Sequence, residues 1–342
     1  MSQAINKKNE YRKNLAEIFI KSLEENGLDW KKEWHQTQAR PFNAKSNAHY
    51  RGINLFRLMM ESMNKGYNDP RWATFNQVKD MGCSLKGAKG TGVLIEYWFP
   101  YDREEKKAIT WKKFKEETGG VPDERYILSV KYSTVFNAKY IEGIKPLPLP
   151  EKREIVIDEL VETLSKEMDV EILNDGDGRA FYRPKEDKIH LPEKDDFYSD
   201  YAYNSTALHE LAHATGAEHR LNRNLVGDFG SEAYAYEELI AEITSCFMSY
   251  HLEIEQDEQH VNNHAAYVNS WISILKDKPE TLVKAIADAE KASSYMELKA
   301  GLIRVQEYEK SVESTLEVES KKEISEDSRI KMEAKEEIAP RV

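Results

Sequence analysis

The stretch "STALHELAHATGAEHR", residues 205–220, contains the motif H-E-x-x-H at His209, Glu210 and His213. On an α-helix, two residues four positions apart lie on the same face, one turn from each other. Two imidazole nitrogens at that spacing can bind one Zn²⁺ ion at about 2.0–2.1 Å each. Glu210, beside the first histidine, is placed to act as a base toward water at the metal. The stretch therefore predicts a helix that carries a zinc centre, with Glu210 as its catalytic residue.

A third metal ligand has to come from further along the chain, and two residues are candidates. His219 extends the motif to H-E-x-x-H-x-x-G-x-x-H, the metzincin spacing, although no Met-turn is obvious downstream. Glu238 lies in a second helical segment at 232–250, and gluzincins take their third ligand from a second helix in this way. We favour Glu238 as the ligand. His219 is then a surface residue in the loop after the metal helix.

The segment at 232–250 also places Glu242 one turn after Glu238, so both carboxylates share a face. Acids on an otherwise apolar helix are costly to bury unless a cation compensates them. We therefore expect Glu242 to hydrogen-bond a ligand histidine and to fix its tautomer. Glu237 lies about 100° round the helix from Glu238, and we expect it outside this face. The spacing does not decide which tyrosine stabilises the oxyanion, and three are candidates: Tyr203, Tyr234 and Tyr236.

The segment "YRPKEDKIHLP", residues 182–192, predicts a strand before the metal helix. In zincins an edge strand at this place binds extended substrate by β-augmentation. We therefore expect an edge strand here, with His190 as an ordinary strand side chain rather than a metal ligand.

The composition is that of a soluble protein with about two domains. The chain has 342 residues, of which 40% are hydrophobic and 32% are charged. No apolar run approaches the roughly 18–20 residues of a membrane helix, and the N-terminus lacks the apolar region of a secretory signal. The two cysteines, Cys83 and Cys246, form no C-x-x-C pair. We therefore expect a cytoplasmic protein without membrane contact or a disulfide scaffold.

Charge is distributed unevenly along the chain. Residues 1–150 carry 26 Lys and Arg against 18 Asp and Glu, whereas residues 151–342 carry 23 against 43. A basic half joined to an acidic half predicts two different roles. The basic half could bind a polyanion, although a balance of +8 is also that of an ordinary solvated surface.

Apolar periodicity and breaker residues predict the order of elements. A stretch with three prolines near 145–154 predicts a linker, and 102–125 is a charged insertion. We predict helices near 9–27, 49–67, 76 onward, 153–167, around the H-E-x-x-H motif, and at 232–250, 257–276 and 279–297, and strands near 91–101, 125–144, 169–175 and 179–192.

The segment at 49–98 combines basic and aromatic residues, as a site for single-stranded nucleic acid requires. "KGAKG", residues 86–90, places two lysines on a glycine turn whose N–H groups could also meet phosphate. For the aromatic residues, core packing is the competing interpretation. The candidates that we take from this segment are Arg57, Arg71, Lys86, Lys89 and Trp98.

Several segments resemble one known family. "STALHELAHATGAEHRLNR" (205–223) and "FGSEAYAYEELIAEI" (229–243) resemble the C-terminal zincin-like metallopeptidase domain of ArdC-type antirestriction proteins. Three segments resemble the N-terminal domain of that family: "PFNAKSNAHYRGIN" (41–54), "DPRWATFNQVKDMG" (69–82) and "LKGAKGTGVLIEYW" (85–98). The resemblance covers roughly residues 10–300. This chain departs from the family pattern at residues 85–90, where the more usual run is R-K-G-E-K-G, and at the charged insertion at 102–125.

The resemblance implies an α+β protein with two domains. These are an N-terminal mixed α/β domain that binds single-stranded DNA, shared with TraC-type plasmid primases, and a C-terminal zincin-like metallopeptidase domain. It adds Arg51 and Asn54 of "YRGIN" to the DNA-binding candidates, although both could instead hold the fold together. The predicted segments are the DNA-binding domain at 1–145, a Pro-rich linker at 146–152, the metallopeptidase domain at 153–305 and an acidic disordered tail at 306–342.

The function implied is that of an accessory protein of a mobile element, a plasmid, conjugative element or phage. It would protect incoming DNA from host restriction, with Zn²⁺ as cofactor, single-stranded DNA as partner and a peptide or protein as potential substrate. The alternative is a non-proteolytic DNA-binding or replication accessory protein whose metal site is structural. The sequence does not predict an oligomeric state.

Overall fold

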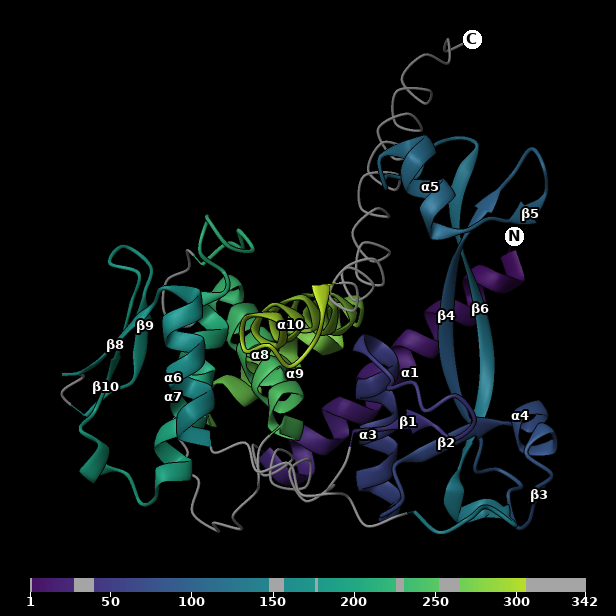
Figure 1. The fold of residues 1–342 in the computed structure, drawn as a ribbon, viewed down its shortest axis with the longest axis horizontal. Helices are drawn as coiled ribbons and strands as arrows, with labels where there is room; N and C mark the ends of the chain where they lie inside the picture. The colour runs from purple at the N-terminus through teal and green to yellow at the C-terminus, as the bar shows by residue number, and fades with distance from the viewer. Residues whose placement is uncertain are drawn as a thin grey trace, which may run out of the picture.

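The computed structural model of the chain describes residues 2–27, 40–147, 157–175, 178–225, 231–251 and 265–305. It is an α+β protein, as the sequence predicts, with a sheet-rich N-terminal half and a helix-rich C-terminal half (Figure 1). The predicted tail at 306–342 and most of the predicted linker at 146–152 lie outside the described residues. Within those ranges, no helix is both long and apolar enough to cross a bilayer.

The N-terminal half is built on a five-stranded sheet in the order β1-β2-β6-β4-β5. β4 and β6 form a long antiparallel pair, from Val93 opposite Val135 to Asp102 opposite Tyr126. Figure 1 shows this pair as a tall hairpin with β5 and α5 at its far end. The strands are β1 (Phe42–Asn43), β2 (Arg71–Thr74), β4 (Val93–Asp102), β5 (Lys107–Ala108) and β6 (Tyr126–Asn137), with a separate pair of β3 (Ser84–Leu85) and β7 (Ile141–Glu142).

The helices of this half are α1 (Ser2–Asn26), α3 (Gly52–Lys65), α4 (Phe75–Asp80), α5 (Trp111–Thr118) and the 3-10 turn η2 (Ala138–Tyr140). Three of them, α1, α3 and α4, lie where periodicity predicts them, whereas α5 lies in the charged insertion at 102–125, for which no helix was predicted. α3 ends at Gly66, whose left-handed backbone conformation suits a glycine. α4 begins after Thr74 in a reciprocal capping box with Gln77. The short strand β2 was not predicted, because four residues before a helix are too few to show alternation.

The C-terminal half packs helices against a three-stranded sheet in the order β8-β10-β9. β10 is parallel to β8 and antiparallel to β9, so it is the central strand. The prediction of an edge strand at 182–192 is therefore wrong for β10, because both sides of its backbone are paired. The elements are α6 (Ile157–Met168), β8 (Glu171–Asn174), β9 (Phe181–Arg183), β10 (Lys188–Leu191), η3 (Lys194–Asp196), α7 (Asp200–Ala214), α8 (Glu232–Met248), η4 (Ser249–His251), α9 (Ala265–Asp277) and α10 (Glu280–Lys299).

The largest apolar core joins the two halves of the chain. Phe19 of α1 and Phe56 of α3 belong to the same buried cluster as Ile240 of α8, Trp271 of α9 and Ile286 of α10. α1 then continues from this bundle to the β4–β6 hairpin (Figure 1). Burial of each large apolar side chain contributes roughly 1.5–3 kcal/mol, so the shared core holds the two halves together.

Candidate metal centre

Helices α7 and α8 carry the residues of the predicted metal site. α7 begins after Ser199, whose hydroxyl accepts a hydrogen bond from the Ala202 N–H, and Asp200 places a negative charge at the positive end of the helix. α8 begins after Ser231, whose hydroxyl accepts a hydrogen bond from the Tyr234 N–H. Both helices are largely buried, so packing fixes the side chains on their facing sides.

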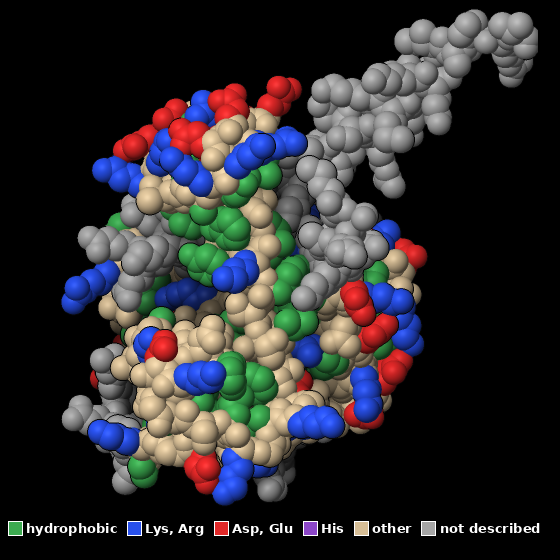
Figure 2. Space-filling view, turned by 90° about the vertical axis from the view of Figure 1, so that its right-hand side faces the viewer, with side chains coloured by type: hydrophobic (Ala, Val, Ile, Leu, Met, Phe, Trp, Pro, Cys, Tyr) green, Lys and Arg blue, Asp and Glu red, His purple; other side chains and the backbone are tan. Residues whose placement is uncertain are grey.

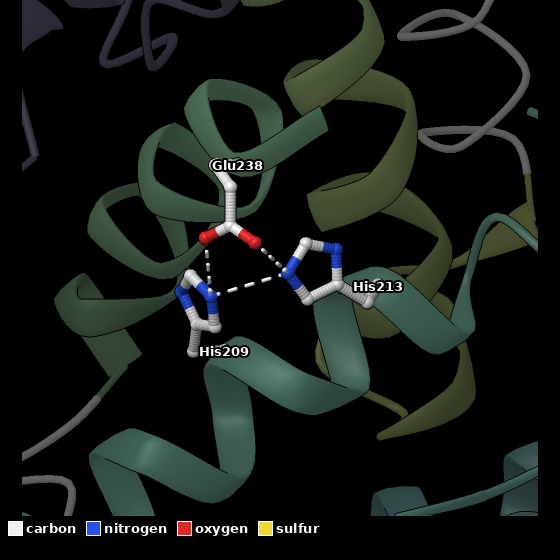
Figure 3. A group of neighbouring side chains, drawn as sticks. All are labelled: His209, His213 and Glu238. Carbon is white, nitrogen blue, oxygen red and sulfur yellow. Dashed lines mark hydrogen bonds and ion pairs between the residues drawn. The ribbon is translucent and has the colours of Figure 1, made fainter. Parts of the chain in front are cut away.

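His209, His213 and Glu238 converge on one point between the two helices (Figure 3). The Nε2 atoms of the histidines lie 3.2 Å apart, and each lies 3.6 Å from a carboxylate oxygen of Glu238. Tetrahedral ligands about 2.05 Å from an ion lie about 3.3 Å from each other. The three residues therefore fit a tetrahedral divalent cation with one position left for water or substrate. Within the ranges that the structure describes, no other group of three such side chains forms.

Each ligand histidine has a carboxylate at the other edge of its ring. Glu242 Oε2 lies 3.9 Å from His209 Nδ1, which is an ion-pair distance rather than the predicted hydrogen bond. Glu237 Oε1 lies 3.2 Å from His213 Nδ1. A carboxylate that holds the proton on Nδ1 leaves the Nε2 lone pair for a metal. Glu237, which was expected outside the face of Glu238 and Glu242, is thus also in contact with a ligand histidine. Glu238 approaches the Nε2 edge of His213 and Glu237 the Nδ1 edge, so adjacent positions of α8 flank one imidazole.

Arg223, in the loop after α7, holds Glu237 in place. Its guanidinium donates to both carboxylate oxygens, at 2.7 Å from Nη2 and 3.1 Å from Nε. Burial would raise the pKa of Glu237, but the hydrogen bond with His213 and the charge and hydrogen bonds of Arg223 outweigh it and keep that pKa below its usual value. Glu237 is thus a carboxylate at neutral pH.

Glu210 and His219 of the extended motif are not among the three residues of the ligand cluster. Glu210 follows His209 on α7 and is only 5% exposed. Its side chain leaves the helix about 100° from that of His209, so it flanks the ligands, and its role as a base stays a prediction. His219 is 63% exposed, and its Nε2 lies 3.4 Å from Asp187. The geometry therefore favours Glu238 over His219 as the third ligand.

The tyrosines considered for the oxyanion have other contacts. Tyr203 Oη lies 3.3 Å from Asn174, and Tyr236 Oη donates to Asp288 at 2.8 Å. Burial and the Asp288 charge raise the pKa of Tyr236, so this hydroxyl stays protonated and links α8 to α10. Tyr234 packs half-buried against the shared core. These contacts do not single out one of the three for the oxyanion.

Most of the predicted DNA-binding residues make contacts inside the protein. Arg51 pairs with Glu290 and Glu297 at 3.1 Å each. The Asn54 side-chain amide bonds both the N–H and the carbonyl of Glu96. Both residues thus connect elements of the fold, which is the alternative left open for them.

Arg57, Arg71 and Trp98 also have internal partners. Arg57 Nη1 donates to the Asn14 side chain at 3.1 Å. Arg71 is buried, with bonds to the Asp69 carboxylate and the Lys145 carbonyl. Trp98 Nε1 donates at 2.8 Å to the buried carboxylate of Glu96. These contacts favour structural roles for the three side chains, and their role in DNA binding stays a prediction.

Lys86 and Lys89 are the exposed members of the predicted set. Lys86 Nζ lies 2.8 Å from Glu142, but the two side chains are 76% and 57% exposed. Such a surface pair contributes at most about 1 kcal/mol, so a phosphate can replace the carboxylate as partner. Lys89 lies on the turn between β3 and β4. Both remain DNA-binding candidates.

An aromatic strip on β4, formed by Tyr97 and Phe99, lies outside the set of predicted DNA-binding residues. Tyr97 is 61% exposed, and its ring stacks on that of Phe99 at 6.3 Å between centroids. Lys131 of β6 lies opposite Tyr97 in the sheet register. The signal in the sequence is the i, i+2 spacing of the two rings on a strand. Figure 2 shows hydrophobic side chains with Lys and Arg side chains beside them on the side of the molecule that carries this hairpin.

Two family models match the chain over the two halves described above. Residues 9–136 match the N-terminal domain of anti-restriction factor ArdC, and residues 159–288 match a zincin-like metallopeptidase. Among relatives, two DNA primases TraC of Escherichia coli are 37% identical over 84% of the chain. The chain spans only 20% of one primase and 27% of the other. The uncharacterized protein y4eC of Sinorhizobium fredii is 30% identical over 81% of the chain and 88% of that protein.

Solved structures agree with the family models. The antirestriction protein ArdC from the R388 plasmid matches with TM-scores of 0.66 in its metal-free structure and 0.65 in its Mn(II)-bound structure, at 29% identity. The match covers 86% of this chain and 98% or 99% of the ArdC chains. The chain therefore belongs to the ArdC family of antirestriction proteins, with an ArdC N-terminal domain followed by a zincin-like metallopeptidase domain.

Proposed function

We propose that this protein binds single-stranded DNA through its N-terminal half and carries a gluzincin-type Zn²⁺ peptidase centre in its C-terminal half. It would act in the cytoplasm and protect the incoming DNA of a plasmid, conjugative element or phage from host restriction. The observation that carries the proposal is the convergence of His209, His213 and Glu238 beside the buried Glu210. The family and the exposed basic and aromatic residues of the N-terminal half support the DNA-binding part.

The donor set suits zinc. Two imidazole nitrogens and one carboxylate oxygen at tetrahedral spacing are the ligands of catalytic zinc sites, and they leave one position open. A divalent cation bound there would supply Lewis-acid polarisation of a carbonyl and make water a nucleophile at neutral pH. The Mn(II)-bound structure of the R388 relative supports the proposal that this protein also binds a divalent cation.

The protein's own groups would hold the ligands and move one proton. Glu237 and Glu242 face the Nδ1 edges of the two histidines and keep their Nε2 atoms available. Glu210 would accept a proton from the attacking water on its carboxylate and deliver it to the departing amide nitrogen of a peptide. Burial of the site among α7, α8 and α10 limits the bulk water that reaches these groups.

The decisive experiment compares wild type with Glu210→Gln, which keeps size and removes the base. The variant should retain metal and affinity for single-stranded DNA but lose peptidase activity on denatured protein substrates. Protection of incoming DNA from restriction is then measured in cells. Loss of protection would make proteolysis part of the mechanism, whereas a wild type without metal would refute the proposed centre.

The alternative function is a non-proteolytic DNA-binding or replication accessory protein with a structural metal. The specific observation behind it is that a segment like this chain forms about a fifth of a DNA primase. Full protection by Glu210→Gln, together with unchanged DNA binding, would favour this alternative. Loss of protection in a folded, metal-loaded variant would exclude it.

A further inference from the structure

The loop after α7, residues 215–225, folds back on α7. The side chain of Arg223 holds it there by hydrogen bonds. The guanidinium donates to the Ala212 carbonyl at 2.8 Å, to the Thr215 hydroxyl at 2.7 Å and to both carboxylate oxygens of Glu237. The side chain is only 9% exposed. Arg223 thus joins the C-terminal turn of α7 to the first turns of α8, the two helices that supply the metal ligands.

Glu237 connects this arginine to a metal ligand. Its Oε1 lies 2.7 Å from Arg223 Nη2 and 3.2 Å from His213 Nδ1, so one oxygen faces both partners. A bidentate guanidinium–carboxylate pair has a defined plane and direction. The orientation of the Glu237 carboxylate, and with it the hydrogen bond to the imidazole, is therefore set by Arg223.

Gly216 leaves the space that this arrangement needs. A Cβ atom at this position would lie 2.6 Å from Leu225 and about 3.0–3.1 Å from the Arg223 guanidinium. Such distances are too short for atoms in contact, so the side chains of Leu225 and Arg223 would have to shift. The glycine that matches the metzincin spacing is thus explained by packing of the loop on α7, without a metal role for His219.

We propose that Arg223 is a positioning residue of the metal centre, acting through Glu237 on the ring and tautomer of His213. The inference rests on the proposed metal centre, and it goes beyond it by assigning a residue outside the H-E-x-x-H motif to the control of metal affinity. Lysine would keep the charge but could not form the two parallel hydrogen bonds together with those to Ala212 and Thr215. Arginine is therefore specifically required.

Arg220 provides a matched control in the same loop. Its side chain is 2% exposed and bonds Asp187 and the carbonyls of Met168 and Ala214. It holds the loop in place as Arg223 does, but through Asp187 and backbone carbonyls rather than through Glu237 or a metal ligand. Replacement of Arg220 should therefore cost stability without changing the metal centre.

The test uses the full chain and five variants: Arg223→Met, Arg223→Lys, Glu237→Gln, Arg220→Met and the double variant Arg223→Met with Glu237→Gln. Zn²⁺ affinity is measured by competition with a chromophoric chelator, and the visible spectrum of Co²⁺-loaded protein reports ligand geometry. Arg223→Met and Glu237→Gln should each weaken Zn²⁺ binding about 10–100-fold and alter the spectrum. The double variant should lose little more than the weaker single variant, because both act on one ligand. Arg223→Lys should recover part of the affinity.

Arg220→Met should bind Zn²⁺ like wild type, with an unchanged spectrum and a lower unfolding temperature. Wild-type affinity and an unchanged spectrum in both Arg223→Met and Glu237→Gln would overturn the inference while leaving the metal centre intact. If Arg223→Met does not fold, Arg223→Lys decides the matter, because it keeps the charge and loses the bidentate pair: weaker Zn²⁺ binding would support the inference, and wild-type binding would overturn it. A wild-type chain that binds neither Zn²⁺ nor Co²⁺ would overturn the proposed function and this inference together.

Discussion

Arg51 and Glu290 form an ion pair of 3.1 Å although they are 239 positions apart in the chain. The same carboxylate accepts a hydrogen bond from the Gly52 N–H at 2.8 Å. Glu290 of α10 thus provides an acceptor for one of the backbone N–H groups that have no partner within the first turn of α3. Arg40 and Glu297 pair nearby at 2.9 Å. The "YRGIN" segment, residues 50–54, therefore links the N-terminal half of the protein to α10 of the C-terminal half.

Replacement of Arg51 by alanine should destabilise the protein by about 3 kcal/mol, because it leaves Glu290 and Glu297 buried with less compensation. Urea unfolding measures this change. Below the unfolding transition, affinity for single-stranded DNA should match that of wild type. A variant of normal stability with weakened DNA binding would instead place Arg51 in the DNA site.

Replacement of Lys86 and Lys89 by alanine should weaken binding of single-stranded DNA. If both contact phosphate, the slope of log affinity against log salt should become shallower by about 1.4, at about 0.7 for each contact. Fluorescence anisotropy at several salt concentrations gives the slope. Stability should barely change, since the Lys86–Glu142 pair is exposed. Lys185→Ala, an exposed lysine of the C-terminal half, serves as control, and an equal loss in it would speak against a specific site.

Replacement of Tyr97 by alanine should lower affinity for single-stranded DNA by about 1–3 kcal/mol, which is the contribution of one base stacked on an aromatic ring. The effect should persist at high salt, because stacking does not depend on counterions. Tyr198→Ala, which removes a 66% exposed tyrosine of the C-terminal half, is the control. Equal affinities of Tyr97→Ala and wild type would remove the aromatic strip from the DNA site.

Glu297 should make stability sensitive to acid. Burial would raise its pKa, but the hydrogen bond with His251 and the charges of Arg40 and Arg51 lower it from 4.5 to about 2. Because the folded-state pKa is the lower one, the contribution is complete above about pH 4.5 and is lost as the pH falls toward 2. The Glu297 carboxylate thus contributes on the order of 3 kcal/mol to the free energy of unfolding at neutral pH.

The acid effect is measured as the difference in unfolding free energy between wild type and Glu297→Gln. This difference should be largest at pH 6 and shrink between pH 4.5 and pH 3. A difference that stays constant over this range would show that the carboxylate is not stabilised in the folded state.

Replacement of His219 by alanine should leave metal binding intact, since its imidazole contacts Asp187 rather than the ligand cluster. Glu238→Ala should weaken metal binding more strongly. The loss should exceed the roughly 10–100-fold that follows from replacing a residue that only contacts a ligand. Metal content after dialysis and chelator competition distinguish the two variants. Weaker binding in a folded His219→Ala variant, with normal binding in Glu238→Ala, would restore the metzincin ligand set.

The order of helices and strands could largely be predicted from the sequence, because periodicity and caps act over a few residues. Gly66 ends α3 and Thr74 caps the start of α4, both close to the predicted limits at 67 and 76. β2 and the central position of β10 could not be predicted, because strand pairing depends on partners far away in the chain. The internal contacts of Arg57 and Arg71 could not be predicted for the same reason. The sequence around an arginine does not show whether its side chain will bind a phosphate or a group inside the protein.

The sequence by itself determined that His209 and His213 share one face of their helix, and that Glu238 and Glu242 share one face of the next. Both statements follow from helix geometry. Only the tertiary structure decided how the two helices meet. Their packing brings Glu238 to the Nε2 edges of the histidines and Glu237 to the Nδ1 edge of His213. The folded loop then adds Arg223 to that carboxylate. These contacts depend on the placement of α8 against α7, which no local spacing encodes.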